Sequence, residues 1–201
     1  MSTIRPFCMD DLLKFNNINL DVLTETYNMS FYMSYMSRWP EAFTGKALYF
    51  VDPAVTAWHP KFLTLRPISL VAESSNGELM GYMLGKAEGE GKLWHGHVSA
   101  VTVAPRYRRL GLARTLMDDF EEMCIHQYNA YFVDLFVRAS NSLAIQMYET
   151  FGYSVYRRVL GYYSGELPED AFDMRKALPL DVDKESVVPL GHPIRPEDLE
   201  W

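Results

Sequence analysis

"VTVAPRYRRLGLARTLM", from Val101 to Met117, is the stretch of sequence that decides the fold. Its first residues have the alternation and β-branched side chains of a strand, and its last residues have the apolar spacing of a helix. A strand that runs directly into a helix presents free backbone N–H groups and the positive end of the helix dipole, which together bind phosphate. The sequence therefore predicts an anion-binding turn at Gly111, where the missing Cβ would leave room for a pyrophosphate against the backbone.

The spacing separates this turn from two well-known phosphate-binding motifs. The pattern Arg-x-x-Gly-x-Ala lacks the first glycines of a dinucleotide fingerprint and the Lys-Ser/Thr pair of a P-loop. A solvated basic helix start would be the simpler explanation of an isolated Arg-Gly pair. Here the pair follows a β-rich strand that ends in Ala-Pro, so the anion-binding interpretation is favoured. Arginines gather only locally, which fits a compact anionic ligand.

Composition describes one ordinary folded domain with a tail. The chain has 201 residues, 48% of them hydrophobic and 22% charged, enough for a single large core. A net charge of −7 argues against a nucleic-acid partner, because binding to a phosphate backbone needs cations over a broad face. No apolar run approaches the roughly 20 residues of a membrane span, and the N-terminus lacks the apolar region of a secretory signal. Two cysteines are too few for a disulfide framework or a zinc cluster. We therefore expect a cytoplasmic protein.

Periodicity along the rest of the chain predicts an α/β sheet with mixed strand directions. An irregular segment at about 43–67 is expected to be a surface insertion, and the proline-rich segment 179–201 an extended tail beyond a domain of residues 1–178. The expected elements are a helix with apolar positions from Leu12 to Leu20, a second helix before Pro40, a hairpin around Asn76-Gly77, a strand over "WHGHVSAVTVAP", a helix from Leu110 to Gln127, a strand over "YFVDLFV", a helix from Asn141 to Phe151, and two final strands.

The stretch "VTVAPRYRRLGLARTLM" resembles the acetyl-CoA-binding motif of the GNAT acetyltransferases, whose pattern is Gln/Arg-x-x-Gly-x-Gly/Ala, and "FVDLFVRASNSLAIQMYETFGY" is similar to their last strand–helix pair. A more specific resemblance is to the catalytic subunits of the NatB-type N-terminal acetyltransferases. It is carried by "FNNINLDVLTETY", "WHGHVSAVTVAP", "VDLFVRASN", "GYSVYRRVLGYYS" and "DAFDMRKAL".

The resemblance implies a GNAT fold, in which helices flank a mixed central β-sheet. It also implies transfer of acetyl from acetyl-CoA to the α-amine of the initiator Met in proteins beginning Met-Asp, Met-Glu, Met-Asn or Met-Gln, by direct attack in a ternary complex. The alternatives are a GNAT enzyme that acts on lysine or a small amine, and a catalytically silent acyl-CoA-binding module.

The resemblance also implies the residues that bind the cofactor and assist the leaving group. Tyr148 falls where these enzymes often carry a tyrosine near the CoA sulfur, and it would hydrogen-bond to the departing thiolate. Tyr148 would equally fit an apolar helical stripe, and Asn141 an N-cap. The implied acetyl-CoA contacts are Val101, Val103, Arg108, Arg109, Leu110, Gly111, Leu112, Ala113 and Asn141.

A second group of residues is implied in peptide binding. His95, His97 and Ser99 share one face of their strand. A histidine pair at i, i+2 suggests a metal, but the sequence offers no third ligand at plausible spacing, so no metal is expected. The resemblance instead makes His97 a catalytic residue and places it with Ser99 in the peptide pocket, where family members carry Thr in place of Ser99. Two loops would grip the substrate through Glu25, Tyr27, Tyr162 and Tyr163, residues that on sequence alone are a solvated acid and surface aromatics.

The first predicted helix also suggests a partner. It is apolar on more than one side between Leu12 and Leu23, more than a lone helix on a small domain needs. The resemblance implies a heterodimer with the large helical-repeat auxiliary subunit of NatB, ribosome association through that subunit, and nascent protein N-termini as substrates. No direct contact with nucleic acid or membrane is expected.

Overall fold

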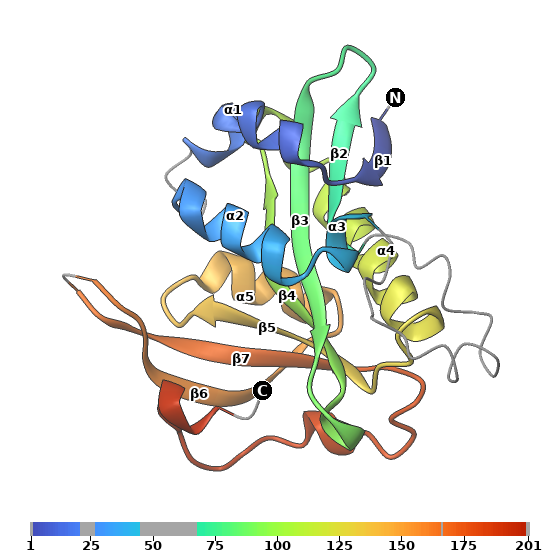
Figure 1. The fold of residues 1–201 in the computed structure, drawn as a ribbon. Coiled ribbons are helices and arrows are strands. Elements are labelled where there is room, and N and C mark those ends of the chain that lie inside the picture. The colour runs from blue at the N-terminus through green and yellow to red at the C-terminus, as the bar shows by residue number, and fades with distance from the viewer. Residues whose placement is uncertain (1, 21–26, 45–67, 166, 200–201) are drawn as a thin grey trace. The chain divides into compact units, whose positions relative to one another are not determined.

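The computed structural model describes residues 2–20, 27–44, 68–165 and 167–199. Within them, seven strands form a mixed sheet in the order β1-β2-β3-β4-β5-β7-β6 (Figure 1). β4 and β5 pair in parallel, whereas β1 with β2, β2 with β3, β5 with β7, and β6 with β7 pair antiparallel. The predicted α/β class is confirmed. The strands are β1 Ser2–Pro6, β2 Leu70–Ser74, β3 Leu79–Glu88, β4 His95–Val103, β5 Phe132–Arg138, β6 Ser154–Tyr163 and β7 Glu169–Ala177.

The chain divides into two compact units. The first comprises Met1–Lys86 and Ala100–Met123, and the second Ala87–Ser99 and Cys124–Trp201. The helices of the first unit are α1 Asn16–Asn19, α2 Met29–Arg38, α3 Glu41–Thr44 and most of α4 Leu112–His126; α5 Ser142–Thr150 belongs to the second. None of the described helices combines the length and the apolar character that a membrane crossing requires.

Aromatic rings form much of the core of the first unit. Phe15 stacks on Tyr82 with ring centroids 5.3 Å apart, and Phe7 meets Tyr82 edge-on at 5.8 Å. The Tyr82 hydroxyl, buried among them, donates a hydrogen bond to Asn19 Oδ1 at 2.9 Å. This bond satisfies the one polar group that the ring brings into the core.

The N-terminal segment differs from the single helix that the apolar spacing predicts. It consists of β1, a 3-10 turn at Met9–Leu13 and the short α1. Arg5 on β1 donates to both carboxylate oxygens of Asp11, at 2.8 and 2.7 Å, and the Cys8 N–H donates to the same group at 2.9 Å. Burial alone would raise the pKa of Asp11, but these hydrogen bonds lower it below its ordinary value. Hydrophobic periodicity does not reveal an ion pair such as that between Arg5 and Asp11. The sequence pattern therefore does not predict β1.

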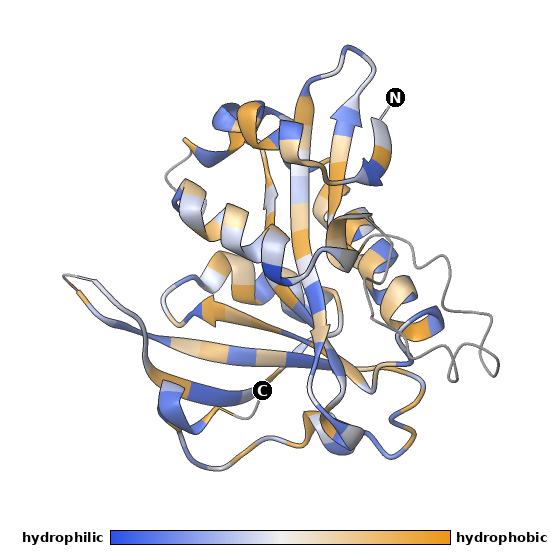
Figure 2. Ribbon diagram, viewed as in Figure 1, coloured by the Kyte–Doolittle hydropathy of each residue, from blue (hydrophilic) through white to orange (hydrophobic). Residues whose placement is uncertain are grey.

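α4 packs through one apolar face, as its sequence predicts. Leu112, Leu116 and Phe120 are buried on that face, and the colouring of Figure 2 shows hydrophilic residues interleaved with them along the helix. At its start, Leu112 shares a cluster with Val103, the last residue of β4. This contact fixes the turn between β4 and α4.

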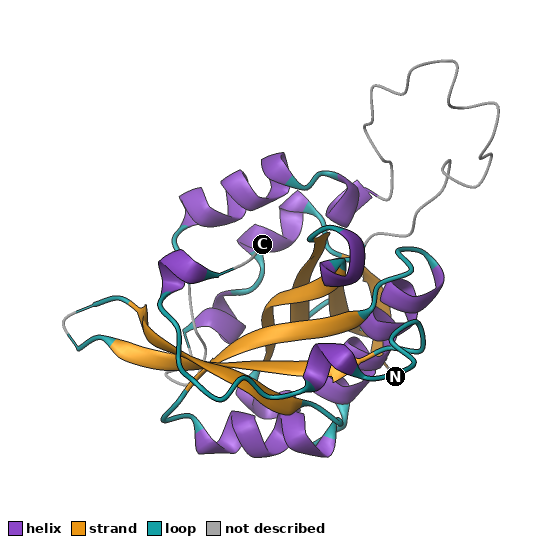
Figure 3. Ribbon diagram, turned by 90° about the horizontal axis from the view of Figure 1, so that it is seen from below, coloured by secondary structure: helices purple, strands orange, loops and turns teal. Residues whose placement is uncertain are grey.

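In the second unit, β6 and β7 form a long twisted hairpin (Figure 3). The C-terminal segment, which composition predicts to be extended, pairs with β6 rather than leaving it. The Leu160 N–H donates to the Ile194 carbonyl at 2.8 Å, and Leu199 is buried against Val159 and Ala171. The boundary at residue 178 stays a prediction. Residues 45–67, most of the expected insertion, lie outside the described residues.

Candidate active site

The turn before α4 has the backbone conformation that its glycine suggests. Gly111 has φ +81° and Arg109 has φ +64°, both in the left-handed region. A Cβ on Gly111 would have no described protein atom within 4 Å, so packing does not explain the glycine. The positive φ of Gly111 and the open space beside its Cα explain why a glycine is present there. The N–H groups of the first turn of α4 lack intrahelical acceptors and are available to a ligand.

The cations around this turn are mostly engaged within the protein. Arg106 pairs with Glu78 at 3.1 Å and Arg114 with Asp118 at 3.8 Å. The Arg108 Nε–H donates to the carbonyl of Val103 at 3.1 Å, so this side chain braces the turn. Arg109 is exposed and is the arginine best placed to meet an anion.

The other predicted cofactor contacts of this region differ in exposure. Val103 and Leu112 are buried, Val101 and Ala113 are half-buried, and Leu110 is exposed. Buried Val103 and Leu112 can hold the turn in place but offer a ligand only their backbone.

In the second unit, the parallel register of β4 and β5 pairs His97 with Asp134. The His97 Nδ1–H donates to Asp134 Oδ1 at 2.8 Å. Asp134 is only 4% exposed. Burial alone would raise its pKa, but the charges of His95 and His97 and the hydrogen bond from His97 hold the pKa of Asp134 at about 2. The carboxylate is therefore ionised, and it leaves Nε2 as the ring nitrogen of His97 that can face a substrate.

Aromatic residues extend this pair. The ring of Phe136 lies 5.7 Å from that of His97, and Tyr162 stacks on Phe136 at 4.6 Å. The Tyr163 hydroxyl donates to the Phe136 carbonyl at 3.2 Å. The structure thus brings the predicted peptide-binding residues His97, Tyr162 and Tyr163 together through Phe136.

Sequence reasoning missed Asp134 and Phe136. They alternate on β5 and share a strand face, and this alternation was a usable signal. Their partners His97 and Tyr162 could not be deduced from it, because the contacts depend on strand register.

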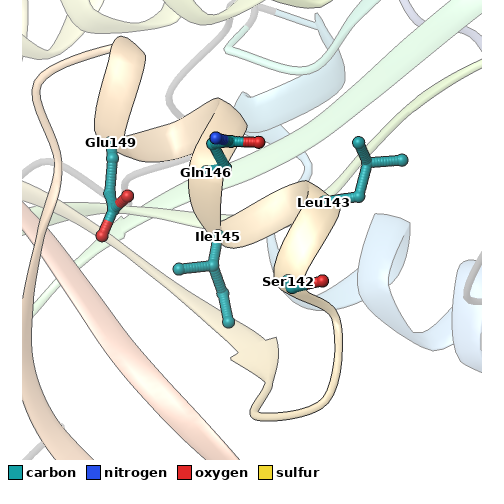
Figure 4. A pocket seen from close by; sticks show the side chains of 5 residues that line it. All are labelled: Ser142, Leu143, Ile145, Gln146 and Glu149. Carbon is teal, nitrogen blue, oxygen red and sulfur yellow. The ribbon is translucent and has the colours of Figure 1, made fainter.

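α5 confirms the simpler interpretations of its two candidate residues. The Asn141 side chain caps the helix by accepting from the Ala144 N–H at 3.1 Å. Tyr148 is buried, with its ring 6.4 Å from Phe151 and 6.0 Å from Tyr153. Their roles toward CoA stay predictions. A hollow of about 400 Å³ lies on this helix, and neither candidate lines it (Figure 4); its lining residues are Ser142, Leu143, Ile145, Gln146 and Glu149.

The remaining predicted peptide-binding residues are Ser99, Tyr27 and Glu25. Ser99 is half-buried on β4. Tyr27, in the first unit, stacks on Phe31 with centroids 4.0 Å apart, before the start of α2. Glu25 lies outside the described residues.

The structure also supplies the third potential metal ligand that the sequence spacing lacked. One ligand atom from each of Glu88, His95 and His97 lies within 4.8 Å of the others. Glu88 comes from the end of β3, so a search along the histidine strand could not find it.

Comparison with known proteins identifies the relatives of this chain. Residues 24–153 match the model of the acetyltransferase (GNAT) family. The chain is 55% identical over 200 residues to N-alpha-acetyltransferase 20 of Dictyostelium discoideum, covering 100% of this chain and 99% of that protein. It is 52% identical over 201 residues to the N-terminal acetyltransferase B complex catalytic subunit NAA20 of Arabidopsis thaliana, with the same coverage.

Similar solved structures agree. Naa20 of Chaetomium thermophilum in complex with a bisubstrate analogue has a TM-score of 0.76 at 35% identity, over 97% of each chain. A chain of the NatB acetyltransferase complex bound to a bisubstrate inhibitor has a TM-score of 0.74 at 36% identity, over 99% of each chain.

Proposed function

This chain belongs to the GNAT acetyltransferase family, and we propose that it is the catalytic subunit of a NatB-type N-terminal acetyltransferase. It transfers acetyl from acetyl-CoA to the α-amine of an initiator Met followed by Asp, Glu, Asn or Gln. The observation that carries this proposal is the identity of 55% with N-alpha-acetyltransferase 20 over nearly the full length of both chains.

The choice of an α-amine suits the chemistry. With an ordinary pKa of about 8, roughly a tenth of an N-terminal amine is neutral at pH 7, against well under a thousandth of a lysine. The neutral nitrogen attacks the thioester carbonyl, forming the C–N bond. The C–S bond then breaks, the amine loses a proton to solvent or a base, and the thiolate of CoA leaves and gains one.

Tyr148 is assigned to the leaving group. A phenol's ordinary pKa of about 10 exceeds a thiol's 8.5, so complete proton transfer would cost about 2 kcal/mol. A hydrogen bond from the hydroxyl to the developing thiolate avoids that cost. The packing of the ring against Phe151 and Tyr153 supports a fixed position for this hydroxyl.

The cofactor's phosphates are assigned to the start of α4. Gly111 leaves the backbone open, the first N–H groups of the helix are donors, and exposed Arg109 adds a charge-assisted bond. Asn141 would add a contact to the CoA arm from the cap of α5. Similar solved structures of the NatB complex are bound to CoA or to a bisubstrate inhibitor, which supports acetyl-CoA as the co-substrate.

His97 is assigned to the second residue of the peptide. Asp and Glu present carboxylate oxygens and Asn and Gln present amide oxygens, so one N–H donor serves all four. With Nδ1 bonded to Asp134, His97 presents Nε2 to the peptide and donates an N–H from that atom when its ring is protonated. Ser99 can add a hydroxyl, with Glu25, Tyr27, Tyr162 and Tyr163 gripping the peptide.

The same relatives support the proposed partner and compartment. We assign to this chain a heterodimer with a large helical-repeat auxiliary subunit, which would bring it to the ribosome and to nascent N-termini in the cytoplasm. The NatB complex structures support the heterodimer.

A transfer assay on peptides tests the function. With acetyl-CoA and the auxiliary subunit present, we expect acetylation of Met-Asp and Met-Glu peptides, little of Met-Leu, and none of a lysine peptide with a blocked N-terminus or of a polyamine. Tyr148→Phe should lower kcat about tenfold or more with little change in peptide KM, whereas the control Tyr131→Phe should change neither. Preferred acetylation of lysine or polyamine would overturn the proposal, and an absence of turnover would favour a silent acyl-CoA-binding module.

A further inference from the structure

A cluster of potential metal ligands lies where β3 ends and β4 begins. Glu88 is the last residue of β3, and His95 and His97 are the first and third residues of β4. One ligand atom from each lies within 4.8 Å of the others. Two imidazoles and one carboxylate form a donor set that suits borderline dications such as Zn²⁺.

The connection between the strands holds His95 in place. Gly89, with φ +97°, lets the backbone approach so closely that a Cβ would lie 2.1 Å from the Leu93 carbonyl oxygen. That oxygen accepts the Nδ1–H of His95 at 2.6 Å. The bond fixes the tautomer, so Nε2 carries the lone pair of the neutral ring.

His97 is oriented in the same way by a different acceptor. Its Nδ1–H donates to Asp134 Oδ1 at 2.8 Å, which directs the lone pair of the neutral ring to Nε2. A histidine that binds a metal typically donates its other N–H to a backbone carbonyl or a carboxylate. His95 has the first arrangement and His97 the second.

His95 gives a second, independent indication. The residue is only 4% exposed, and its Nε2 makes no hydrogen bond with the described part of the chain. The same atom lies 3.5 Å from Asp134 Oδ1, too far for a good hydrogen bond. A buried ring nitrogen this close to a carboxylate oxygen requires either a proton or a metal cation on the nitrogen.

The surrounding charges also favour a cation. Glu88 brings one carboxylate to the cluster, and that of Asp134 lies beside both histidines. Arg157 and Arg175 are bonded instead to Asp173, at 2.8 and 3.1 Å. Glu88 is half-buried, so the cluster reaches solvent on one side.

We propose that Glu88, His95 and His97 form a binding site for a divalent transition metal, with Zn²⁺ as its ligand, and that Asp134 orients His97 as an outer-shell residue. Zn–N distances of about 2.0–2.1 Å place tetrahedral ligand atoms roughly 3.4 Å apart. One ligand atom from each residue lies within 4.8 Å of the others, so the side chains have to move closer to bind one ion, most easily by rotation of half-buried Glu88. Bound Zn²⁺ occupies the lone pair of His97 and thereby inhibits acetylation. This inhibitory role rests on the proposed function, whereas binding does not.

Metal titration of the purified chain tests the site directly. Calorimetry with Zn²⁺ and the visible absorption of Co²⁺ should both show one saturable equivalent. His95→Ala and Glu88→Gln should each weaken binding more than tenfold, and Asp134→Asn by about 10- to 100-fold. The exposed His192→Ala should leave binding unchanged, and thermal unfolding of each variant checks the fold. The site is refuted if no saturable equivalent binds, or if binding survives in folded His95→Ala.

An activity assay tests the inhibitory role separately. Zn²⁺ should reduce acetylation of a Met-Asp peptide at the concentration where calorimetry shows saturation, and a chelator should restore it. Binding without inhibition would overturn the link to His97 and leave the site standing. An enzyme inactive on every peptide would count against the proposed function. It would leave the metal site untouched, because the Co²⁺ spectrum measures metal binding without any need for activity.

Discussion

At the scale of single residues, Asp134 decides what His97 can do. Its carboxylate accepts the Nδ1–H of His97, which leaves Nε2 to make a charge-assisted bond to an acidic side chain when the ring is protonated. We predict that Asp134→Asn lowers kcat/KM about tenfold for Met-Asp peptides and distinctly less for Met-Asn, because a charge-assisted bond is roughly twice as strong as a neutral one. Steady-state kinetics on the two peptides measure the ratio. Asp118→Asn, on exposed α4 surface, is the matched control. An equal fall on both peptides would indicate that Asp134 is merely structural.

The sequence reveals those residues whose roles depend only on neighbours a few positions away in the chain. The turn at Gly111 is encoded by neighbours within a few positions, and its positive φ was implied by the glycine itself. The partnership of His97 with Asp134 spans 37 positions and exists only through the register of β4 and β5. Glu88 was missed for the same reason, since it reaches His95 from the preceding strand.

At the scale of elements, the junction between β4 and α4 can be tested as a cofactor cradle. Asn tolerates positive φ better than other side chains, so Gly111→Asn should keep the fold while placing atoms in the space assigned to pyrophosphate. We predict CoA affinity at least tenfold weaker by calorimetry, with a small change in melting temperature. Gly77→Asn, at φ +82° in the turn between β2 and β3, is the matched control for backbone strain and should bind CoA normally. If both variants bind CoA equally well, the phosphates lie elsewhere.

Elements with a clean period were predicted correctly. The β2–β3 hairpin, β4, α4, β5 and α5 all form where apolar spacing and turn residues place them. The N-terminal segment was predicted wrongly. Hydrogen bonds from Arg5 to Asp11 hold it in a conformation other than the helix that the apolar spacing favours, and its first residues pair with β2. Composition likewise could not show that the C-terminal segment pairs with β6, since that contact uses backbone groups.

At the scale of the whole molecule, the apolar surplus of the N-terminal segment separates into two sets. Leu12, Phe15 and Ile18 are buried in the core of the first unit. The side chains of Leu13 and Leu20, by contrast, are 79% and 85% exposed to solvent. Leu23 lies outside the described residues. The partner hypothesis therefore concerns Leu13 and Leu20, the two leucines of this segment that the described structure leaves exposed.

We predict that the double variant Leu13→Asp and Leu20→Asp loses the auxiliary subunit. Burying one leucine contributes about 1.5–3 kcal/mol, so removing two from an interface should weaken the complex by roughly a hundredfold or more. Both side chains are exposed, so the melting temperature of the isolated chain should change little. Val182→Asp, equally exposed at 83% on the C-terminal segment, controls for the added charge and should co-purify normally. Affinity measured by calorimetry or co-purification decides the matter: a folded double variant that still binds the subunit at wild-type strength would place the interface on another surface.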